Sequence, residues 1–307
     1  MHPFVRVVEI WVPDASGEHL KWHAGTYGPL AEFADHSRDI TFAPGIGLPG
    51  QAWREARPII MKDLSDGAFL RADAAQSAGL TSGVAMPIFQ GRDLRAVLVF
   101  LCGDHGRGDG AIEVWKDDGL SGQSLVDGYY GKLARFERQS RNIKFPLGRG
   151  LPGMVWKSAT PMIADVANTN AFLRSQAALE AGISIGIGIP LNSDHNIDDI
   201  GYVVTFLSVH ATPIARGFEI WNVTDTGDGL CFSSGIEDSV HRILADEPDR
   251  RLARGEGIAG KVLETGLPWL EPSAQGHAGS DPEDDLAQLA IPVYYLNELR
   301  SVVSFRY

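Results

Sequence analysis

Gly-Ile-Gly-Leu-Pro-Gly at residues 45–50 is the stretch that decides the fold, because the chain contains a version of it three times. It returns as Gly-Arg-Gly-Leu-Pro-Gly at 148–153 and as Gly-Glu-Gly-Ile-Ala-Gly at 255–260. The second glycine of each string lies 103 and then 107 residues after its predecessor. A period near one hundred residues is too long for a solenoid repeat and has the size of a domain.

Two more landmarks recur in the same order and place the copies along the chain. Each copy opens with a glutamate and, two positions later, a tryptophan: Glu9 and Trp11, Glu113 and Trp115, Glu219 and Trp221. Each closes with an apolar–proline–apolar triplet, at residues 86–88, 189–191 and 291–293. We therefore divide the chain into three tandem units, residues 1–105, 106–210 and 211–307.

The first unit shows the elements that we expect in all three. Apolar runs on both sides of the turn at 13–17 predict a β-hairpin, and the glycine loop leads into a short helix at 51–55. An alanine-rich helix is expected over 71–78, and strands over 84–89 and 95–101 close the unit. Strands with helices inserted between them favour an α+β fold, with a central antiparallel sheet and short helices and loops on one face.

The order of these elements and motifs resembles a GAF domain, of the kind attached to bacterial sensor kinases and nucleotide cyclases. In unit one the resemblance rests on the glycine loop and helix, followed by Asp63-Leu64, Phe69-Leu70-Arg71, Ala78-Gly79-Leu80 and Met86-Pro87-Ile88. Unit two repeats this series between residues 148 and 191, whereas unit three matches only the first half and the last strands. We therefore expect three tandem GAF-like units, the third a degenerate copy.

The resemblance implies a small-molecule pocket on one face of each sheet, under loops and short helices. In the family the other face packs against a first and a last helix, which also mediate dimers. The junctions near residues 102–112 and 209–218 leave no room for such helices. An uncovered sheet face would expose a large apolar surface. We therefore expect that face to pack on a neighbouring unit or on a second chain, and we predict a homodimer.

The stretch before the alanine-rich helix supplies the candidate ligand residues. In the family it lies over the pocket, so the resemblance implies that a phenylalanine caps the ligand and an arginine meets its carboxylate or phosphate. With the tryptophan of the preceding helix, the candidates are Phe69, Arg71, Trp53, Phe172, Arg174 and Trp156. A structural alternative makes the phenylalanine a core residue and pairs the arginine with Asp63 or Asp165. In unit three the corresponding stretch, 275–285, is acidic and turn-rich, and we expect it to be mobile and to hold no ligand site.

Two other recurring features have structural explanations. The first-strand tryptophans are expected to anchor the apolar face, and the glutamates two positions before them share that face. We expect these glutamates to form salt bridges at the rim or edge contacts; the alternative is that one of them orients a ligand. The Gly-x-Gly-x-x-Gly strings are expected to be turns rather than phosphate sites. Pro49 and Pro152 each remove a backbone donor from them, and no buried parallel strand precedes them.

Composition excludes several classes of function. The 307 residues include 27 Lys and Arg against 39 Asp and Glu, a net charge of −12, which opposes binding to nucleic acid or to an anionic membrane. The sequence shows no membrane-spanning run and no signal peptide, and its two distant cysteines fit a reducing compartment, so we expect a cytoplasmic protein. Cys102, Cys231 and the nine histidines form no pattern typical of a metal, haem, bilin or nucleophile site. We therefore expect no cofactor and no enzymatic activity.

These observations leave two functions open. The first is a non-enzymatic sensor that binds an unknown small molecule in the pockets of units one and two and signals through a partner protein that carries the output domain. The second is a GAF-fold interaction or dimerisation protein that has kept the fold and lost the ligand. A polar group that converges on a real cavity would favour the sensor. Cavities filled by side chains would favour the interaction protein.

Overall fold

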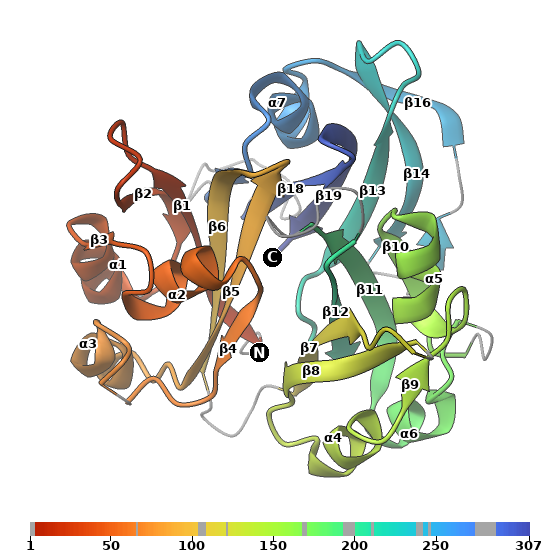
Figure 1. Ribbon diagram of the computed structural model, residues 1–307, viewed down its shortest axis with the longest axis horizontal. Coiled ribbons are helices and arrows are strands. Elements are labelled where there is room, and N and C mark those ends of the chain that lie inside the picture. Colours follow the sequence, from red (N-terminus) through yellow and green to blue (C-terminus); the bar gives the residue numbers. More distant parts are fainter. Residues whose placement is uncertain are drawn as a thin grey trace, which may run out of the picture.

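Three antiparallel sheets, one from each third of the chain, make up the protein (Figure 1). The computed structural model describes residues 4–65, 67–103, 109–120, 122–167, 171–192, 200–209, 212–237, 242–244, 247–273 and 287–307. The sheets lie around a common centre, and most of the helices lie on the outside (Figure 1). The predicted α+β fold with antiparallel sheets and few short helices is therefore confirmed.

The first two sheets have the same strand order. The first runs β3-β2-β1-β6-β5-β4 and the second runs β9-β8-β7-β12-β11-β10. The strands of the first sheet are β1 (Val5–Pro13), β2 (Leu20–Thr26), β3 (Thr41–Phe42), β4 (Ile59–Met61), β5 (Ser82–Gln90) and β6 (Asp93–Cys102). Its helices are α1 (Ala31–Arg38), α2 (Gly47–Glu55) and α3 (Ala72–Ser77). The strands of the second sheet are β7 (Gly110–Asp117), β8 (Gln123–Tyr129), β9 (Lys144–Phe145), β10 (Met162–Asp165), β11 (Ile183–Leu191) and β12 (Tyr202–Val209). Its helices are α4 (Ala134–Ser140), α5 (Gly150–Ser158) and α6 (Ser175–Glu180).

The third sheet repeats this order as β15-β14-β13-β19-β18-β17, with β16 also paired to β14. Its strands are β13 (Gly217–Val223), β14 (Gly229–Glu237), β15 (Arg242–Leu244), β16 (Glu247–Ala253), β17 (Trp269–Glu271), β18 (Gln288–Tyr295) and β19 (Glu298–Arg306). Helix α7 (Gly257–Thr265) follows its glycine loop. The stretch 275–285, which we expected to be mobile, lies outside the described residues.

Each sheet is irregular at the same place, immediately before the first-strand tryptophan. The register of the first hairpin shifts before Trp11 in unit one, before Trp115 in unit two and before Trp221 in unit three. A bulge bends the strand locally and re-aims the side chains beside it. The units thus share their strand order and also the local backbone geometry that orients the tryptophan side chain.

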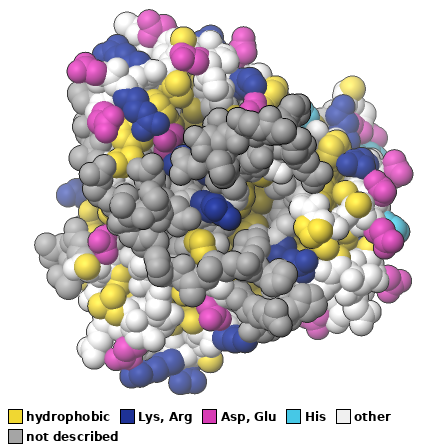
Figure 2. Space-filling view, turned by 180° about the vertical axis from the view of Figure 1, so that it is seen from behind, with side chains coloured by type: hydrophobic (Ala, Val, Ile, Leu, Met, Phe, Trp, Pro, Cys, Tyr) yellow, Lys and Arg dark blue, Asp and Glu magenta, His cyan; other side chains and the backbone are white. Residues whose placement is uncertain are grey.

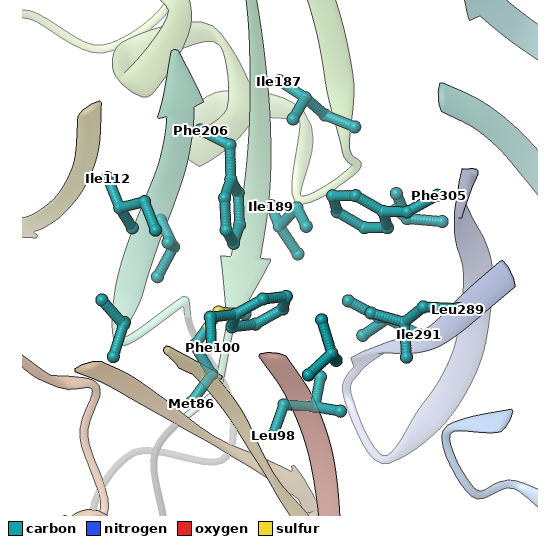
Figure 3. Close-up of a cluster of buried hydrophobic side chains, with 14 of the residues drawn as sticks. Met86, Leu98, Phe100, Ile112, Ile187, Ile189, Phe206, Leu289, Ile291 and Phe305 are labelled. Carbon is teal, nitrogen blue, oxygen red and sulfur yellow. The ribbon is translucent and has the colours of Figure 1, made fainter. Parts of the chain in front are cut away.

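The faces of the three sheets that lie away from the helices pack on one another. One phenylalanine from the last strand of each unit lies at the centre (Figure 3). The ring centroids of Phe100 and Phe206 are 5.3 Å apart, and those of Phe206 and Phe305 are 5.6 Å apart. The surrounding apolar cluster draws on every unit and includes Val8, Met86, Leu98, Ile112, Ile187, Ile189, Leu289 and Ile291. The bare face of each sheet therefore packs on neighbouring units, which is one of the two arrangements that we expected. Covering these faces does not require a second chain, and the homodimer stays a prediction.

The recurring glycine loop is a tight turn that opens a helix, which confirms its structural role. Gly47 has a φ of +62°, a region that favours glycine. A Cβ on Gly50 would lie 2.2 Å from the backbone oxygen of Ala43. The equivalent glycines, Gly153 and Gly260, approach backbone oxygens so closely that a Cβ would lie 2.1 and 2.4 Å away. The last glycine of each string is therefore required by close backbone packing.

The helices differ from the prediction in two ways. Helix α2 begins at Gly47 rather than at residue 51, so the end of the glycine loop is its first turn. Proline is tolerated in a first turn, where the amide has no partner within the helix. Helices α1 and α4 were not predicted. Each buries only a narrow stripe, centred on Phe33 in α1 and on Phe136 in α4, which leaves a weak periodic signal.

Charges are mixed on the face shown in Figure 2, where acidic side chains lie around the outline among basic ones. Over the coloured atoms of this view, the net charge of −12 is not gathered into one patch. None of the helices in the described ranges is both long and apolar enough to span a membrane.

Candidate functional site

The helix-covered face of the first sheet holds a buried ion pair. Arg71, the residue before α3, donates from Nη1 to Glu9 Oε1 at 2.6 Å and from Nη2 to Glu9 Oε2 at 2.9 Å. The two side chains are 3% and 0% exposed. Trp11 Nε1 and the Tyr27 hydroxyl also donate to the carboxylate, each at 3.0 Å. Arg71 Nη1 donates in addition to the hydroxyl of Ser37. Each oxygen of Glu9 thus accepts two hydrogen bonds.

The second sheet repeats this network. Arg174 donates to Glu113 Oε1 at 2.6 Å and to Oε2 at 2.8 Å, and the side chains are 5% and 0% exposed. The Tyr130 hydroxyl and Trp115 Nε1 donate to the same carboxylate at 3.0 and 3.2 Å. Thr205 adds a fifth hydrogen bond, at 3.1 Å. The network is therefore part of the repeated unit rather than a feature of one copy.

Aromatic rings enclose both guanidinium groups. Arg71 Cζ lies 4.7 Å from the ring centroid of Phe33 and 5.2 Å from that of Phe69. Arg174 Cζ lies 4.5 Å from the ring centroid of Phe136. A cation over a ring face is attracted by the ring quadrupole, more strongly when water is excluded. The aromatic rings therefore help to keep both guanidinium groups buried, with Arg71 and Arg174 5% and 7% exposed.

The electrostatics of both networks keep the pair charged. Burial alone would raise the pKa of Glu9, but the positive charge and hydrogen bonds of Arg71 outweigh it and hold that pKa below its usual value. The same balance lowers the pKa of Glu113. Burial, and then the nearby carboxylate, raise the pKa of Tyr27 and of Tyr130. Both tyrosines are therefore neutral donors to a charged glutamate at pH 7.

Unit three holds a more open version of the same arrangement. Arg250 of β16 donates to Glu219 at 2.7 Å, and Trp221 Nε1 donates to it at 3.1 Å. Arg250 Cζ lies 4.4 Å from the ring centroid of Phe232. The arginine and glutamate side chains are 39% and 20% exposed. The first-strand glutamate is thus paired in all three units, although in unit three its arginine comes from a different element.

The six predicted site residues fall into two groups. Four of them belong to the two networks: Phe69, Arg71, Phe172 and Arg174. The other two are partly buried on α2 and α5, where they pack against the cores of their units: Trp53 and Trp156. Binding of a ligand by any of the six stays a prediction.

Two expectations about the charged residues are wrong. Glu9 and Glu113 are fully buried on the sheet face rather than placed at its rim. Arg71 pairs with Glu9 and not with Asp63, whose carboxylate accepts hydrogen bonds from Ser65. The sequence did contain the signal. A glutamate two positions before a buried tryptophan shares its buried face, and a buried carboxylate requires a cation.

The space over the networks differs between the first two units. In unit one an open groove of about 900 Å³ lies between α1 and α3. Its lining includes Leu30, Phe33, Ile40, Phe69 and Leu70. In unit two an ion pair of 2.7 Å joins Arg135 of α4 to Glu180 of α6. The hollow beside Arg174 in that unit is too small for a water molecule.

Reactive groups are scarce in the described ranges. Cys102 is buried, and burial raises the pKa of its thiol to about 12, so the thiol stays protonated and unreactive at neutral pH. Within these ranges no group of three His, Cys, Asp or Glu side chains is placed to hold a metal ion.

The first unit is similar to one known family. A family model described as GAF domain matches residues 5–116. This stretch is similar to a GAF domain. The match covers all six strands of the first sheet and includes Glu9 and Arg71. No curated protein matches the chain.

Solved structures similar to this chain align with about a third of it. The GAF domain of A. aeolicus nlh2 in an inactive state is 17% identical over 32% of this chain and 58% of that one, with a TM-score of 0.26. The free methionine-R-sulfoxide reductase from Neisseria meningitidis is 16% identical over 32% of this chain and 52% of that one, with a TM-score of 0.26. A GAF domain/HD domain protein from Geobacter sulfurreducens is 15% identical over 32% of this chain and 63% of that one, with a TM-score of 0.28. The matched part spans less than two thirds of each of these proteins.

Proposed function

We propose that the protein is a non-enzymatic GAF-fold interaction module that binds a partner protein. An internal ion pair holds the arginine that the family resemblance assigns to a small molecule. The proposal is carried by one observation. In units one and two, an arginine predicted to meet a ligand is buried and bound through two nitrogens to a glutamate of its own sheet.

A ligand that used Arg71 would have to displace Glu9 from it. Breaking a buried ion pair by removing one partner costs about 3–5 kcal/mol. At 1.4 kcal/mol for each factor of ten, this would weaken binding by roughly a hundred-fold to several thousand-fold. The hydrogen bonds of Trp11 and Tyr27 to the same carboxylate add to the cost. The network therefore favours a structural role over the capture of a small molecule.

The shared core supports the same function. A sensor needs two arrangements of the protein that its ligand binds with different affinity. Here the three sheets are joined through fully buried side chains such as Phe206, and close-packed interiors resist small displacements. A partner that recognises the outer surface requires no movement of one unit against another.

Native mass spectrometry of the protein purified from cells tests this proposal. We expect the mass of the chain, or of the predicted homodimer, with no additional small molecule released on denaturation. A retained molecule of metabolite size would overturn the proposal in favour of the sensor. Two matched variants would then locate it: its loss in Phe69→Leu would place the ligand in unit one, and its loss in Phe172→Leu would place it in unit two.

A further inference from the structure

The groove between α1 and α3 is a surface feature that the buried networks do not explain. The two helices lie on the outside of the first sheet, away from the shared core (Figure 1). Leu70 lines the groove and is 49% exposed. Its Cγ lies 3.6 Å from the place of a Cβ on Gly47, and the neighbouring Ile46 is 50% exposed. A contiguous apolar patch rimmed by polar residues is typical of an interaction site, and these side chains extend the apolar lining of the groove to the surface.

The rim of the groove is acidic. Glu32 of α1 and Asp73 of α3 are exposed and line it. Among the described lining residues the only arginine or lysine is Arg71, which is buried and paired with Glu9. His36 is the remaining ionisable side chain of the lining. Charge complementarity at such a rim attracts basic groups and repels acidic ones.

Unit two bridges the corresponding gap with an ion pair. The positions 103 residues after Glu32 and Ser77 are Arg135 and Glu180, which form the ion pair across the gap between α4 and α6. The two units therefore differ at this gap: it is open and has an acidic rim in unit one, and an ion pair bridges it in unit two.

We infer that the groove between α1 and α3 binds a short segment of the partner protein that carries leucine-like apolar side chains together with lysines or arginines. The inference rests on the proposed function and names the partner's chemistry. A segment laid in an apolar groove buries its apolar face there. Its basic side chains would then meet Glu32 and Asp73 at the rim.

Fluorescence anisotropy with two labelled peptides of about 14 residues tests the inference, since helices much shorter than this are marginal in water. One peptide consists of leucine and lysine, and in the other every lysine is replaced by glutamate. At a physiological ionic strength of about 0.15 M, the wild-type protein should bind the leucine–lysine peptide and not the leucine–glutamate peptide.

Three double variants, checked for folding by circular dichroism, show whether the groove is responsible. E32R/S77E copies the unit-two ion pair into unit one and should weaken binding at least about tenfold, because it blocks the gap and places a positive charge on the rim. R135E/E180S opens unit two and should add a second binding site. S16E/E18R makes the same change of residue types on the exposed hairpin turn and should leave the affinity nearly unchanged.

Several results would overturn the inference. Equal losses of peptide affinity in E32R/S77E and S16E/E18R would mean that binding depends only on the net charge of the protein. Groove-dependent binding of octylamine without binding of the peptide would assign the groove to a small molecule. Self-association that competes with the peptide would assign it to a second copy of the chain. The mass measurement keeps the two proposals apart. A retained metabolite overturns the proposed function, whereas a bare chain without groove-dependent peptide binding overturns only this inference.

Discussion

Replacing Arg71 with methionine should destabilise the protein by about 3–5 kcal/mol at pH 7, the usual cost of leaving one charge of a buried ion pair without its partner. Methionine keeps a long apolar side chain between Phe33 and Phe69 but removes both nitrogens that contact Glu9, at 2.6 and 2.9 Å. Two hydrogen-bond donors, Trp11 and Tyr27, remain on the carboxylate. Neither of them supplies a positive charge.

Two further variants separate the charge effect from a general loss of packing. The double variant E9Q/R71M should be at least about 2 kcal/mol more stable than R71M alone, because no unpaired charge stays buried. Arg38→Met removes an ion pair of 2.7 Å with Asp35 in which both side chains are more than half exposed. That change should cost less than about 1 kcal/mol.

The pH dependence has a definite sign. The pKa of Glu9 is lowered in the folded protein, so its contribution to stability is present above the unfolded value of about 4.3 and is lost as the pH falls through the folded value. In R71M, burial without the guanidinium should raise that pKa. The deficit of R71M relative to wild type should therefore be largest at pH 7 and smaller at pH 5.

Urea unfolding followed by circular dichroism and tryptophan fluorescence measures these differences, with the slope m checked for constancy. A loss of stability in R71M no larger than that in R38M would contradict a buried, unpaired charge on Glu9. The same contradiction would follow if E9Q/R71M were no more stable than R71M, or if the deficit of R71M did not shrink toward pH 5.

Two substitutions test the packing of the fold. Phe206→Ala removes a fully buried ring from the shared core and should cost about 3–5 kcal/mol, with circular dichroism and fluorescence reporting one coincident transition; separate melting of one sheet would contradict a common core. Gly50→Ala places a Cβ 2.2 Å from a backbone oxygen and should cost at least about 1–3 kcal/mol. Gly67→Ala meets nothing within 4 Å and should change stability by no more than about 0.5 kcal/mol; similar thermal midpoints for the two glycine variants would contradict the close approach at Gly50.

The antiparallel sheet of each unit and the glycine turns could be predicted because the chain repeats the elements that form them. Each recurrence of the loop and of the closing Pro87 triplet fixes the same local geometry again. Helix α1 could not be predicted in this way, since it buries little more than Phe33, Ala34 and Ser37. The way in which the bare sheet faces are covered depends on contacts among three distant segments, and a pattern within one segment does not encode them.

The sequence predicted that Phe69 and Arg71 belong to the candidate site, but it did not predict that Arg71 pairs with Glu9. Phe69 and Arg71 were recognised from their motif, yet the partner of the arginine lies 62 positions earlier, at Glu9. Local sequence favours a nearby aspartate, and only the folded sheet brings the first strand under α3. The groove is open in unit one, where Glu32 stands at the position that Arg135 occupies in unit two. The effect of this difference can be seen only when the positions of α1 and α4, which were not predicted, are known.

The meeting of three sheets at Phe100, Phe206 and Phe305 has a consequence for how this protein can evolve. Each inner face keeps water from the other two, so deleting, duplicating or exchanging one unit would expose apolar surface on those that remain. Substitutions on the inner faces must therefore compensate one another across units. The outer helices are under no such constraint, and α1 and α4 already differ in charge. The shared core therefore ties the three units to one another, whereas the surfaces of the outer helices can change independently.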